Sequence, residues 1–417
     1  MPAPDLEPLD RALLGGEFGP AAARAMALLV RYGSGVRADR FVSIGSAHID
    51  GCLYHGPASI DFARRFADLG GRVRVPTTLN VAALDTVHAE WHCGPPELIE
   101  SQRQLNALHV ALGCRPTLTC APYQSHPRPR FGEHVAWAES NAIVFVNSVL
   151  GARTDRYGDF TDLAAALTGR VPFAGLHRDE NRLARALIGV VDLGKSGLPR
   201  DLYFAAVGFV LGRVSAGQVP LLEGLPADAS EDELKSLGAA AASSGGLGLF
   251  HALEVTPEAP TLATASGGRT IPRGADLSSD DLARAVATLC PLQVGEPVAA
   301  MCLGTPHFSR GEFAELARSV CGRRAAPAVR VYVSTSRAIA AQLEASEDRA
   351  LLEHFGVRVV VDTCTYVTPG LTMSAGAIVT NSAKYAHYGP GNLRRRVGLM
   401  TLERCIRSAE CGTVAAP

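Results

Sequence analysis

The feature that most constrains the fold is a repeated pattern: a short apolar, β-branched run ends at a small polar residue, and a polar or amphipathic stretch follows. Strands that alternate with helices in this way indicate an α/β fold with largely parallel sheets. The runs predicted as strands are residues 41–46, 73–80, 116–120, 142–148, 248–256, 297–307, 329–336, 357–364 and 377–384. The stretches predicted as helices are residues 60–69, 95–112, 181–191, 279–289, 310–320 and 337–347.

The length of the chain predicts more than one domain. At 417 residues it exceeds the size at which a single hydrophobic core usually stops growing. Residues 220–230 and 256–276, rich in proline, glycine and charge, are interpreted as loops or connections between lobes. We predict one α/β lobe over residues 1–215 and a second over residues 216–417. The second lobe is expected to carry strand ends that lie beside a metal cluster.

Charge and hydropathy exclude several classes of protein. Lys and Arg number 40 and Asp and Glu 41, so the net charge of −1 lacks the basic surplus of a nucleic-acid-binding protein. No run reaches the roughly 18 consecutive apolar residues of a membrane span, and the acidic N-terminus does not resemble a secretion signal. We therefore expect a cytoplasmic protein with no nucleic-acid or membrane partner. Ten cysteines are too few for a disulfide scaffold.

Three cysteines lie at predicted strand ends, where α/β proteins collect their ligands. They are Cys120, Cys302 and Cys364. Thiolates on three strand ends can hold an iron–sulfur cluster and leave one iron site open. Because the chain has no Cys-x-x-Cys pair, spacing alone favours a small buried hydrophobic residue over a ligand for each of these cysteines taken singly.

Two other groups suggest hydrolase chemistry. His88 and His92 lie four residues apart, a spacing that suits a zinc pair or an exposed helix face. Cys52 and His55, close to His48, are consistent with a cysteine hydrolase, although sequence spacing does not establish that a nucleophile and a base are adjacent.

Two cations follow apolar runs and suit a small anionic substrate. Lys384 is placed to bind a carboxylate or phosphate, and Arg153 to bind a carboxylate through two hydrogen bonds. Both are also consistent with surface cations in loops. The chain has neither a dinucleotide-binding Gly-x-Gly-x-x-Gly turn nor a P-loop lysine.

The order of these motifs along roughly residues 1–410 resembles aconitase X, a divergent branch of the aconitase superfamily. The segments that carry the resemblance are residues 46–54, 75–85, 119–123, 139–156, 250–259, 303–309, 361–364 and 380–388. The resemblance implies an aconitase-like three-domain α/β/α body and a dehydratase that depends on an iron–sulfur cluster. Within the family, the chain is closest to the cis-3-hydroxy-L-proline dehydratases.

The resemblance also implies which residues bind the cluster. Its thiolates are expected at Cys120 and Cys364. The third cysteine of the family falls in a Gly-Cys-Pro-His segment, where this chain has Thr305 before Pro306 and His307. Cys302, on the same predicted strand, is the expected substitute. The change resembles the hydroxyproline group, for which a [2Fe–2S] cluster is expected, with [3Fe–4S] and [4Fe–4S] as alternatives.

The implied reaction removes the C2 proton of cis-3-hydroxy-L-proline and expels the C3 hydroxyl, and the enamine then tautomerises to Δ1-pyrroline-2-carboxylate. An open iron acts on the hydroxyl as a Lewis acid. His48 or His307 is predicted to protonate the leaving oxygen. The predicted catalytic residues are Ser46, His48, Arg153 and Lys384, and the predicted substrate-binding residues are Thr77, Asn80, Asn147, Ser148 and Ser382.

Aconitase-type enzymes also carry a swivelling fourth domain, which bears the base in aconitases. The length of this chain matches only the three-domain part, so we expect a small swivelling-domain subunit as its partner. Mevalonate 5-phosphate is the alternative substrate, with the chain then the large subunit of its dehydratase. A zinc or cysteine hydrolase and a catalytically silent scaffold subunit remain the alternatives from other classes.

Overall fold

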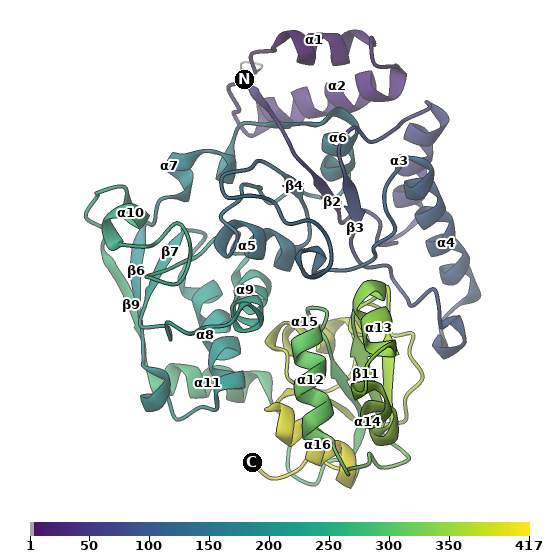
Figure 1. The fold of residues 1–417 in the computed structure, drawn as a ribbon, viewed down its shortest axis with the longest axis vertical. Coiled ribbons are helices and arrows are strands. Elements are labelled where there is room, and N and C mark those ends of the chain that lie inside the picture. The colour runs from purple at the N-terminus through teal and green to yellow at the C-terminus, as the bar shows by residue number, and fades with distance from the viewer. Residues whose placement is uncertain (1–3) are drawn as a thin grey trace.

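The computed structural model describes residues 4–417 as three connected α/β regions (Figure 1). The N-terminal region contains a three-stranded sheet of order β3-β2-β4 and a separate antiparallel pair, β1 with β5. Its elements are α1 (Pro8–Gly15), α2 (Pro20–Gly35), β1 (Phe41–Ser43), β2 (Ala47–Ile49), α3 (Pro57–Asp68), β3 (Thr77–Leu79), η1 (Ala89–Trp91), α4 (Pro96–Ala111), η2 (Pro122–Gln124), β4 (Ala136–Trp137), α5 (Ser140–Ser148), α6 (Thr161–Thr168), β5 (Arg170–Pro172) and η3 (Gly175–His177).

The middle region is built on a four-stranded sheet of order β8-β7-β6-β9, with helices α8 and α9 packed against each other. Its elements are α7 (Asp179–Arg182), β6 (Ala186–Val190), η4 (Leu193–Lys195), α8 (Arg200–Val214), β7 (Pro220–Glu223), α9 (Glu231–Gly245), β8 (His251–Ala252), α10 (Leu262–Ser266), β9 (Arg273–Leu277) and α11 (Ser279–Leu289).

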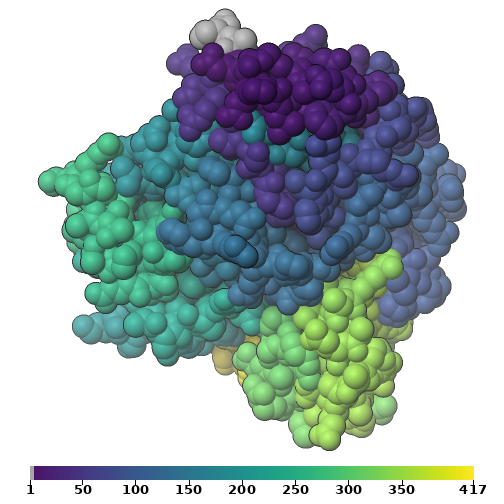
Figure 2. Space-filling model, turned by 45° about the horizontal axis from the view of Figure 1, so that its top comes forward, coloured from purple at the N-terminus to yellow at the C-terminus, as the bar shows by residue number. Residues whose placement is uncertain are grey.

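The C-terminal region has a five-stranded sheet of order β12-β11-β10-β13-β14. In the space-filling view it projects as a lobe from the rest of the molecule (Figure 2). Its elements are β10 (Val298–Leu303), α12 (Arg310–Ser319), β11 (Arg330–Ser334), α13 (Arg337–Glu344), α14 (Asp348–Phe355), β12 (Val357–Val360), β13 (Ala377–Thr380), α15 (Ala383–Leu393), β14 (Val397–Leu399) and α16 (Leu402–Cys411).

All strand pairings in these three sheets are parallel, which confirms the predicted α/β class. Helix α9 lies at the centre of the molecule, because it packs against α8 in its own region, α5 of the N-terminal region and α15 of the C-terminal region (Figure 1). The predicted helices over residues 60–69, 95–112 and 279–289 coincide closely with α3, α4 and α11.

Three predicted strands or helices are wrong, and the two segments interpreted as loops hold β7 (within 220–230) and α10 with most of β9 (within 256–276). Residues 142–148, predicted as a strand, belong to α5; the run is buried on every side, so its apolar pattern does not distinguish a helix from a strand. Residues 181–191, predicted as a helix, hold β6, because pairing with β7 and β9 outweighs the local helix propensity. Residues 116–120 form no strand, although the Thr119 N–H donates to the Leu79 carbonyl over 3.2 Å.

The structure bears on two expectations about the whole chain, the lack of a membrane span and the division into two lobes. None of the helices within residues 4–417 combines the length and the hydropathy that a membrane crossing requires. The predicted division between residues 215 and 216 falls between α8 and β7, and β7 pairs with β6 from the other side of that division. The division into two lobes and the cytoplasmic location stay predictions.

Candidate metal centre and active site

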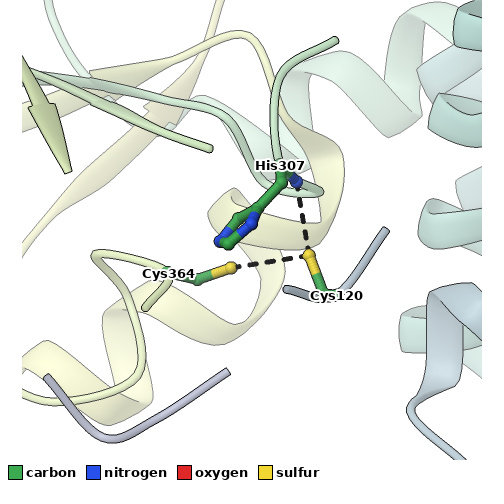
Figure 3. A group of neighbouring side chains, drawn as sticks. All are labelled: Cys120, His307 and Cys364. Carbon is green, nitrogen blue, oxygen red and sulfur yellow. Dashed lines mark hydrogen bonds between the residues drawn. The ribbon is translucent and has the colours of Figure 1, made fainter. Parts of the chain in front are cut away.

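Two cysteine thiols meet where the N-terminal and C-terminal regions face each other (Figure 3). Cys120 lies just before η2 and Cys364 in the loop after β12; both are buried, and their Sγ atoms are 3.8 Å apart. His307, in the loop after β10, donates its backbone N–H to Cys120 Sγ over 3.3 Å. Ligand atoms of these three residues all lie within 4.8 Å of one another, so they form the candidate metal centre.

The parallel sheets explain why residues so distant in sequence converge here. The segment before Cys120 runs beside β3, since Arg115 forms a parallel bridge with Thr78. Cys120 therefore leaves the carboxyl end of the small N-terminal sheet. Strands β10 and β12 are parallel members of the C-terminal sheet, so the loops that carry His307 and Cys364 leave its carboxyl end. Ligand sites of α/β proteins lie at such edges.

The residues at this centre fit an iron–sulfur cluster. Two thiolates bound about 2.3 Å from one tetrahedral metal ion lie about 3.8 Å apart, and the Cys120–Cys364 separation matches that spacing. Cysteine thiolates are the usual ligands of such clusters. Thr305 Oγ1, two residues before His307, is buried and has no hydrogen-bond partner within residues 4–417. Buried polar atoms in folded proteins are usually hydrogen-bonded, and a group bound at this centre can provide the missing hydrogen bond.

The ring of His307 is already hydrogen-bonded on both sides. Nδ1 lies 2.9 Å from Thr119 Oγ1 and Nε2 lies 3.2 Å from the Thr363 carbonyl oxygen. Burial lowers the pKa of His307 to about 4, so the imidazole is neutral at pH 7. The direct contact with the thiol comes from the backbone N–H. The predicted role of His307 as a proton donor stays a prediction.

Cys302 lies inside β10 and is fully buried. It packs in a hydrophobic cluster with Tyr332 and Ile378, whereas Cys120 and Cys364 share a different cluster with Val81. Among the residues that the structure describes, its sulfur is not one of the ligand atoms of the candidate centre. Burial raises the pKa of its thiol to about 11. The predicted ligand role of Cys302 stays a prediction that this geometry does not support.

Lys384, a predicted catalytic residue, forms a buried ion pair with Glu139. Its Nζ donates to Glu139 Oε1 and, over 3.0 Å, to Ser140 Oγ. Burial alone would lower the pKa of Lys384, but the Glu139 carboxylate raises it above the usual value, so the ammonium stays charged. An ammonium has three N–H donors, so two bonds leave one N–H of Lys384 for a substrate anion.

The predicted residues of the N-terminal sheet surround a buried imidazole. His48 Nδ1 lies 2.8 Å from Thr78 Oγ1, and its Nε2 is buried with no partner within the described residues. Burial lowers the pKa of His48 to about 3. Ser46 Oγ accepts a hydrogen bond from the Trp137 indole over 3.0 Å, and the Trp137 ring contacts His48.

Three predicted substrate-binding residues lie at strand ends. Thr77 Oγ1 donates to the Val75 carbonyl over 2.8 Å. Asn80 donates to Asp50, and its Oδ1 is buried without a partner in residues 4–417. Ser382 caps α15 by accepting the Tyr385 N–H over 3.1 Å. Of the three, Asn80 has the polar atom most clearly available to a ligand.

Asn147, Ser148 and Arg153 belong to a different network. Both amide hydrogens of Asn147 are used, by the carbonyls of Thr154 and Gly248, each over 2.9 Å. Ser148 Oγ accepts the Phe250 N–H over 2.9 Å. Arg153 donates to Asp179 over 2.9 Å. Because their hydrogen bonds are already made within the chain, binding substrate would require these residues to break one; their roles stay predictions.

The hydrolase candidates show no nucleophile–base pair. Cys52 is fully buried, its Sγ lies 3.2 Å from the Asn80 carbonyl oxygen, and burial raises the pKa of the thiol well above its usual value. A thiol in that environment is a poor nucleophile. His88 and His92 flank the short helix η1, and His88 Nδ1 lies 2.8 Å from Asp85 Oδ2.

Glu139 and Asn141 lie beside predicted site residues but were not predicted from the sequence. Glu139 has a backbone φ of 75°, a strained conformation of the kind that collects at functional sites. It caps α5 by accepting the Ala142 N–H over 2.8 Å. Asn141 donates to the Cys120 carbonyl over 3.0 Å. An acidic residue directly before a helix start was the available signal, but residues 142–148 were predicted as a strand, so no helix start was recognised.

The fold and the buried thiol pair place this chain in a known class of protein. Family models described as the first, second and third domains of aconitase X match residues 3–180, 184–287 and 298–411. The chain belongs to the aconitase X family. A crystal structure of the holo-form of Thermococcus kodakaraensis aconitase X superposes with a TM-score of 0.85 at 30% identity, covering 97% of this chain and all of that one.

Individual relatives are more similar in sequence. The chain is 43% identical to a cis-3-hydroxy-L-proline dehydratase of Pseudomonas aeruginosa, over 98% of its own length and 70% of the relative. It is 39% identical to an enzyme of the same name from Hypocrea jecorina, over 97% of the chain and 68% of the relative. A phosphomevalonate dehydratase large subunit of Thermococcus kodakarensis is 33% identical, over 91% and 93%. All three relatives are dehydratases, that is, hydro-lyases.

Proposed function

We propose that this chain is the large, cluster-binding part of a cis-3-hydroxy-L-proline dehydratase. One observation carries the proposal: the buried Cys120–Cys364 pair lies in a chain that matches a hydroxyproline dehydratase along 98% of its length. The product is Δ1-pyrroline-2-carboxylate. The predicted small hydroxy-acid substrate, the dehydratase chemistry and the iron–sulfur cofactor all belong to this proposal.

We infer that the cluster is of the [2Fe–2S] type. In a [4Fe–4S] cluster each thiolate binds a different iron. The 3.8 Å between Cys120 Sγ and Cys364 Sγ instead fits two thiolates on the same iron, which favours the smaller cluster. Thr305, where the family pattern has its third cysteine, offers no thiolate.

The residues of the chain bind and orient the substrate. The free N–H of Lys384 binds the substrate carboxylate, where negative charge grows as the C2 proton leaves. His48 is neutral at pH 7 because burial lowers its pKa to about 3, so its ring supplies a hydrogen bond to the departing hydroxyl rather than a full proton. The bound cluster supplies a Lewis acid for that hydroxyl.

We propose that the base which removes the C2 proton comes from a small partner subunit. The phosphomevalonate relatives are named as large subunits, which supports a two-part enzyme. Mixing the chain with a candidate small subunit should therefore switch on turnover.

Mevalonate 5-phosphate remains the second candidate substrate because of length. The chain matches 93% to 98% of the length of the phosphomevalonate dehydratase large subunits, but only 70% and 68% of the hydroxyproline enzymes. Both substrates should therefore be assayed side by side, with and without the small subunit.

The deciding experiment is iron and sulfide analysis with a visible spectrum of anaerobically purified protein. We expect a brown protein whose colour is lost in Cys120→Ala and Cys364→Ala and kept in Cys321→Ala, a control at an exposed cysteine. The brown protein should dehydrate cis-3-hydroxy-L-proline once the small subunit is added. A protein that stays colourless after reconstitution would contradict the proposal.

A substitution tests the role of Lys384. Lys384→Ala should weaken transition-state binding by about 2–5 kcal/mol, the cost of truncating one partner of a buried charge pair. The measurement is kcat/KM for cis-3-hydroxy-L-proline, with Lys195→Ala, at an exposed lysine, as control. An unchanged kcat/KM would remove Lys384 from the site.

A further inference from the structure

Lys235 is a second buried lysine, on helix α9, and its ammonium faces three acceptors. It is 2% exposed. Nζ donates to Asp232 Oδ1 over 2.8 Å, to the Glu312 carboxylate, and to the backbone carbonyl of His307 over 3.4 Å. The three N–H groups of an ammonium are thus matched by three acceptors.

The choice of lysine at this position is itself informative. Of the 40 basic residues in the chain only three are lysines, at positions 195, 235 and 384, and the other cations are arginines. Lys235 and Lys384 are both buried. A compact ammonium directs its donors to acceptors on several sides, whereas the planar guanidinium of arginine suits a single flat partner. At position 235 the N–H groups point to acceptors on α9, on α12 and in the loop that carries His307.

The carbonyl of His307 is where the three regions of the molecule meet. Lys235 reaches it from the middle region, and Gln124 Nε2 donates to the same oxygen over 3.2 Å from the N-terminal region. His307 itself belongs to the C-terminal region. Ser309, two residues further on, donates to Asp232 over 2.6 Å and so ties the same loop to α9.

The other backbone group of His307 contacts the candidate metal centre, because its N–H donates to Cys120 Sγ over 3.3 Å (Figure 3). Hydrogen bonds to a ligand sulfur hold the ligand in place and tune the cluster that it binds. Moving the His307 carbonyl would move this N–H, since both belong to one residue.

We propose that Lys235 is a positioning residue that holds the His307 carbonyl across the junction of the three regions and thereby aims the His307 N–H at Cys120 Sγ. Lys235 itself does not touch the substrate or the thiols. The inference rests on the proposed function only in taking Cys120 as a cluster ligand. The hydrogen bond to Sγ can be tested without the cluster.

The test measures how fast iodoacetamide alkylates Cys120 in the full chain after the metal has been removed. Lys235→Met should lower the Cys120 rate by up to about tenfold, the worth of one typical hydrogen bond, because the reactive thiolate loses a donor that stabilises it. Cys405, fully buried elsewhere in the C-terminal region, reports any general loosening, so the ratio of the two rates is the readout.

Glu312→Gln is the matched control. It removes one of the two ion pairs of Lys235, keeps an acceptor at position 312, and leaves the bond from Lys235 to His307 in place. We expect its Cys120 to Cys405 ratio to equal that of the wild type. Equal ratios in Lys235→Met and Glu312→Gln would overturn the proposal and leave Lys235 with a stabilising role only.

A second variant covers the case in which Lys235→Met does not fold. Gln124→Leu removes the other donor to the same carbonyl and should lower the ratio in the same direction by a smaller factor. If Gln124→Leu leaves the ratio unchanged, the carbonyl does not control the N–H, and the inference is wrong.

The metal-loaded protein supplies an independent readout. Lys235→Met should bind less iron per chain and show a shifted visible spectrum, whereas Glu312→Gln should match the wild type. A wild-type chain that binds no iron would refute the proposed function but leave the alkylation test valid. Failure of the two proposals is therefore distinguishable.

Discussion

His177 shows how strongly burial controls single side chains in this molecule. It is 1% exposed, with Nδ1 2.9 Å from Nδ1 of His134 and Nε2 hydrogen-bonded to the hydroxyl of Tyr157. Burial, reinforced by the nearby His134, Arg182 and Arg153, lowers the pKa of His177 to about 3. The folded state therefore keeps this imidazole neutral where the unfolded chain would protonate it.

This shift predicts a loss of stability in acid. A histidine whose folded pKa lies below its unfolded value contributes stability above pH ~6.5, and the contribution is lost as the pH falls towards the folded pKa. Between about pH 7.5 and about pH 5.5 the loss from His177 should be about 1.4 kcal/mol. Urea unfolding of the wild type and of His177→Asn at the two pH values measures it. The variant should show a pH dependence shallower by that amount, and an equal slope would contradict the assignment.

At the residue scale the sequence predicted the two thiols and His307 but not Glu139. Cys120 and Cys364 were found because each follows a predicted strand, and strand ends meet at one edge of a parallel sheet. Glu139 was not predicted as a site residue because its partner Lys384 lies 245 residues away, and only the folded chain brings the two side chains together.

At the scale of elements, helices α8 and α9 pack unusually closely. A Cβ on Gly208 of α8 would lie 2.2 Å from the carbonyl oxygen of Leu237 on α9, and one on Gly245 of α9 would lie 1.8 Å from the carbonyl oxygen of Gly212. Glycine at these positions lets the two backbones touch. This contact fixes α9, which carries Lys235, relative to the sheet of the middle region.

Gly208→Ala should therefore destabilise the fold, even though alanine is the better helix former. Overpacking a close contact costs about 1–3 kcal/mol. The measurement is the unfolding free energy by urea titration. Gly15→Ala, in α1 with open space around the position, is the control and should leave stability unchanged or slightly higher. Equal stability of the two variants would show that the helices can separate without cost.

Some helices with one exposed face were predicted well, whereas α5 and β6, which tertiary contacts enclose, were not. Helices α3 and α11 have one buried and one exposed side, so their periodicity is visible in the sequence. Helix α5 is buried all round and β6 lies between two other strands, so in both cases tertiary contacts decide the conformation.

At the scale of the whole molecule, the candidate metal centre joins distant parts of the chain. Cys120 and Cys364 are separated by 244 residues and belong to the N-terminal and C-terminal regions. A metal that binds both thiols would act as a cross-link between these regions. Binding to the folded state alone also stabilises it by mass action.

Metal removal should therefore lower the stability of the whole molecule. We expect the unfolding free energy to fall by about 2–4 kcal/mol, the usual effect of a covalent cross-link. Thermal unfolding before and after chelation under anaerobic conditions measures it, with Cys364→Ala as the control that should not respond to chelation. A wild-type unfolding temperature that does not change on chelation would argue against a metal that bridges the two regions.

The sequence by itself determined the α/β class, the aconitase X family and the positions of the two thiols, because each depends on local patterns or on motifs in a fixed order. The tertiary structure alone decided that Cys302 packs apart from the thiols, that Glu139 pairs with Lys384, and that Lys235 reaches the His307 carbonyl. Those contacts join residues far apart in the chain, and their geometry follows from how the three regions pack around α9.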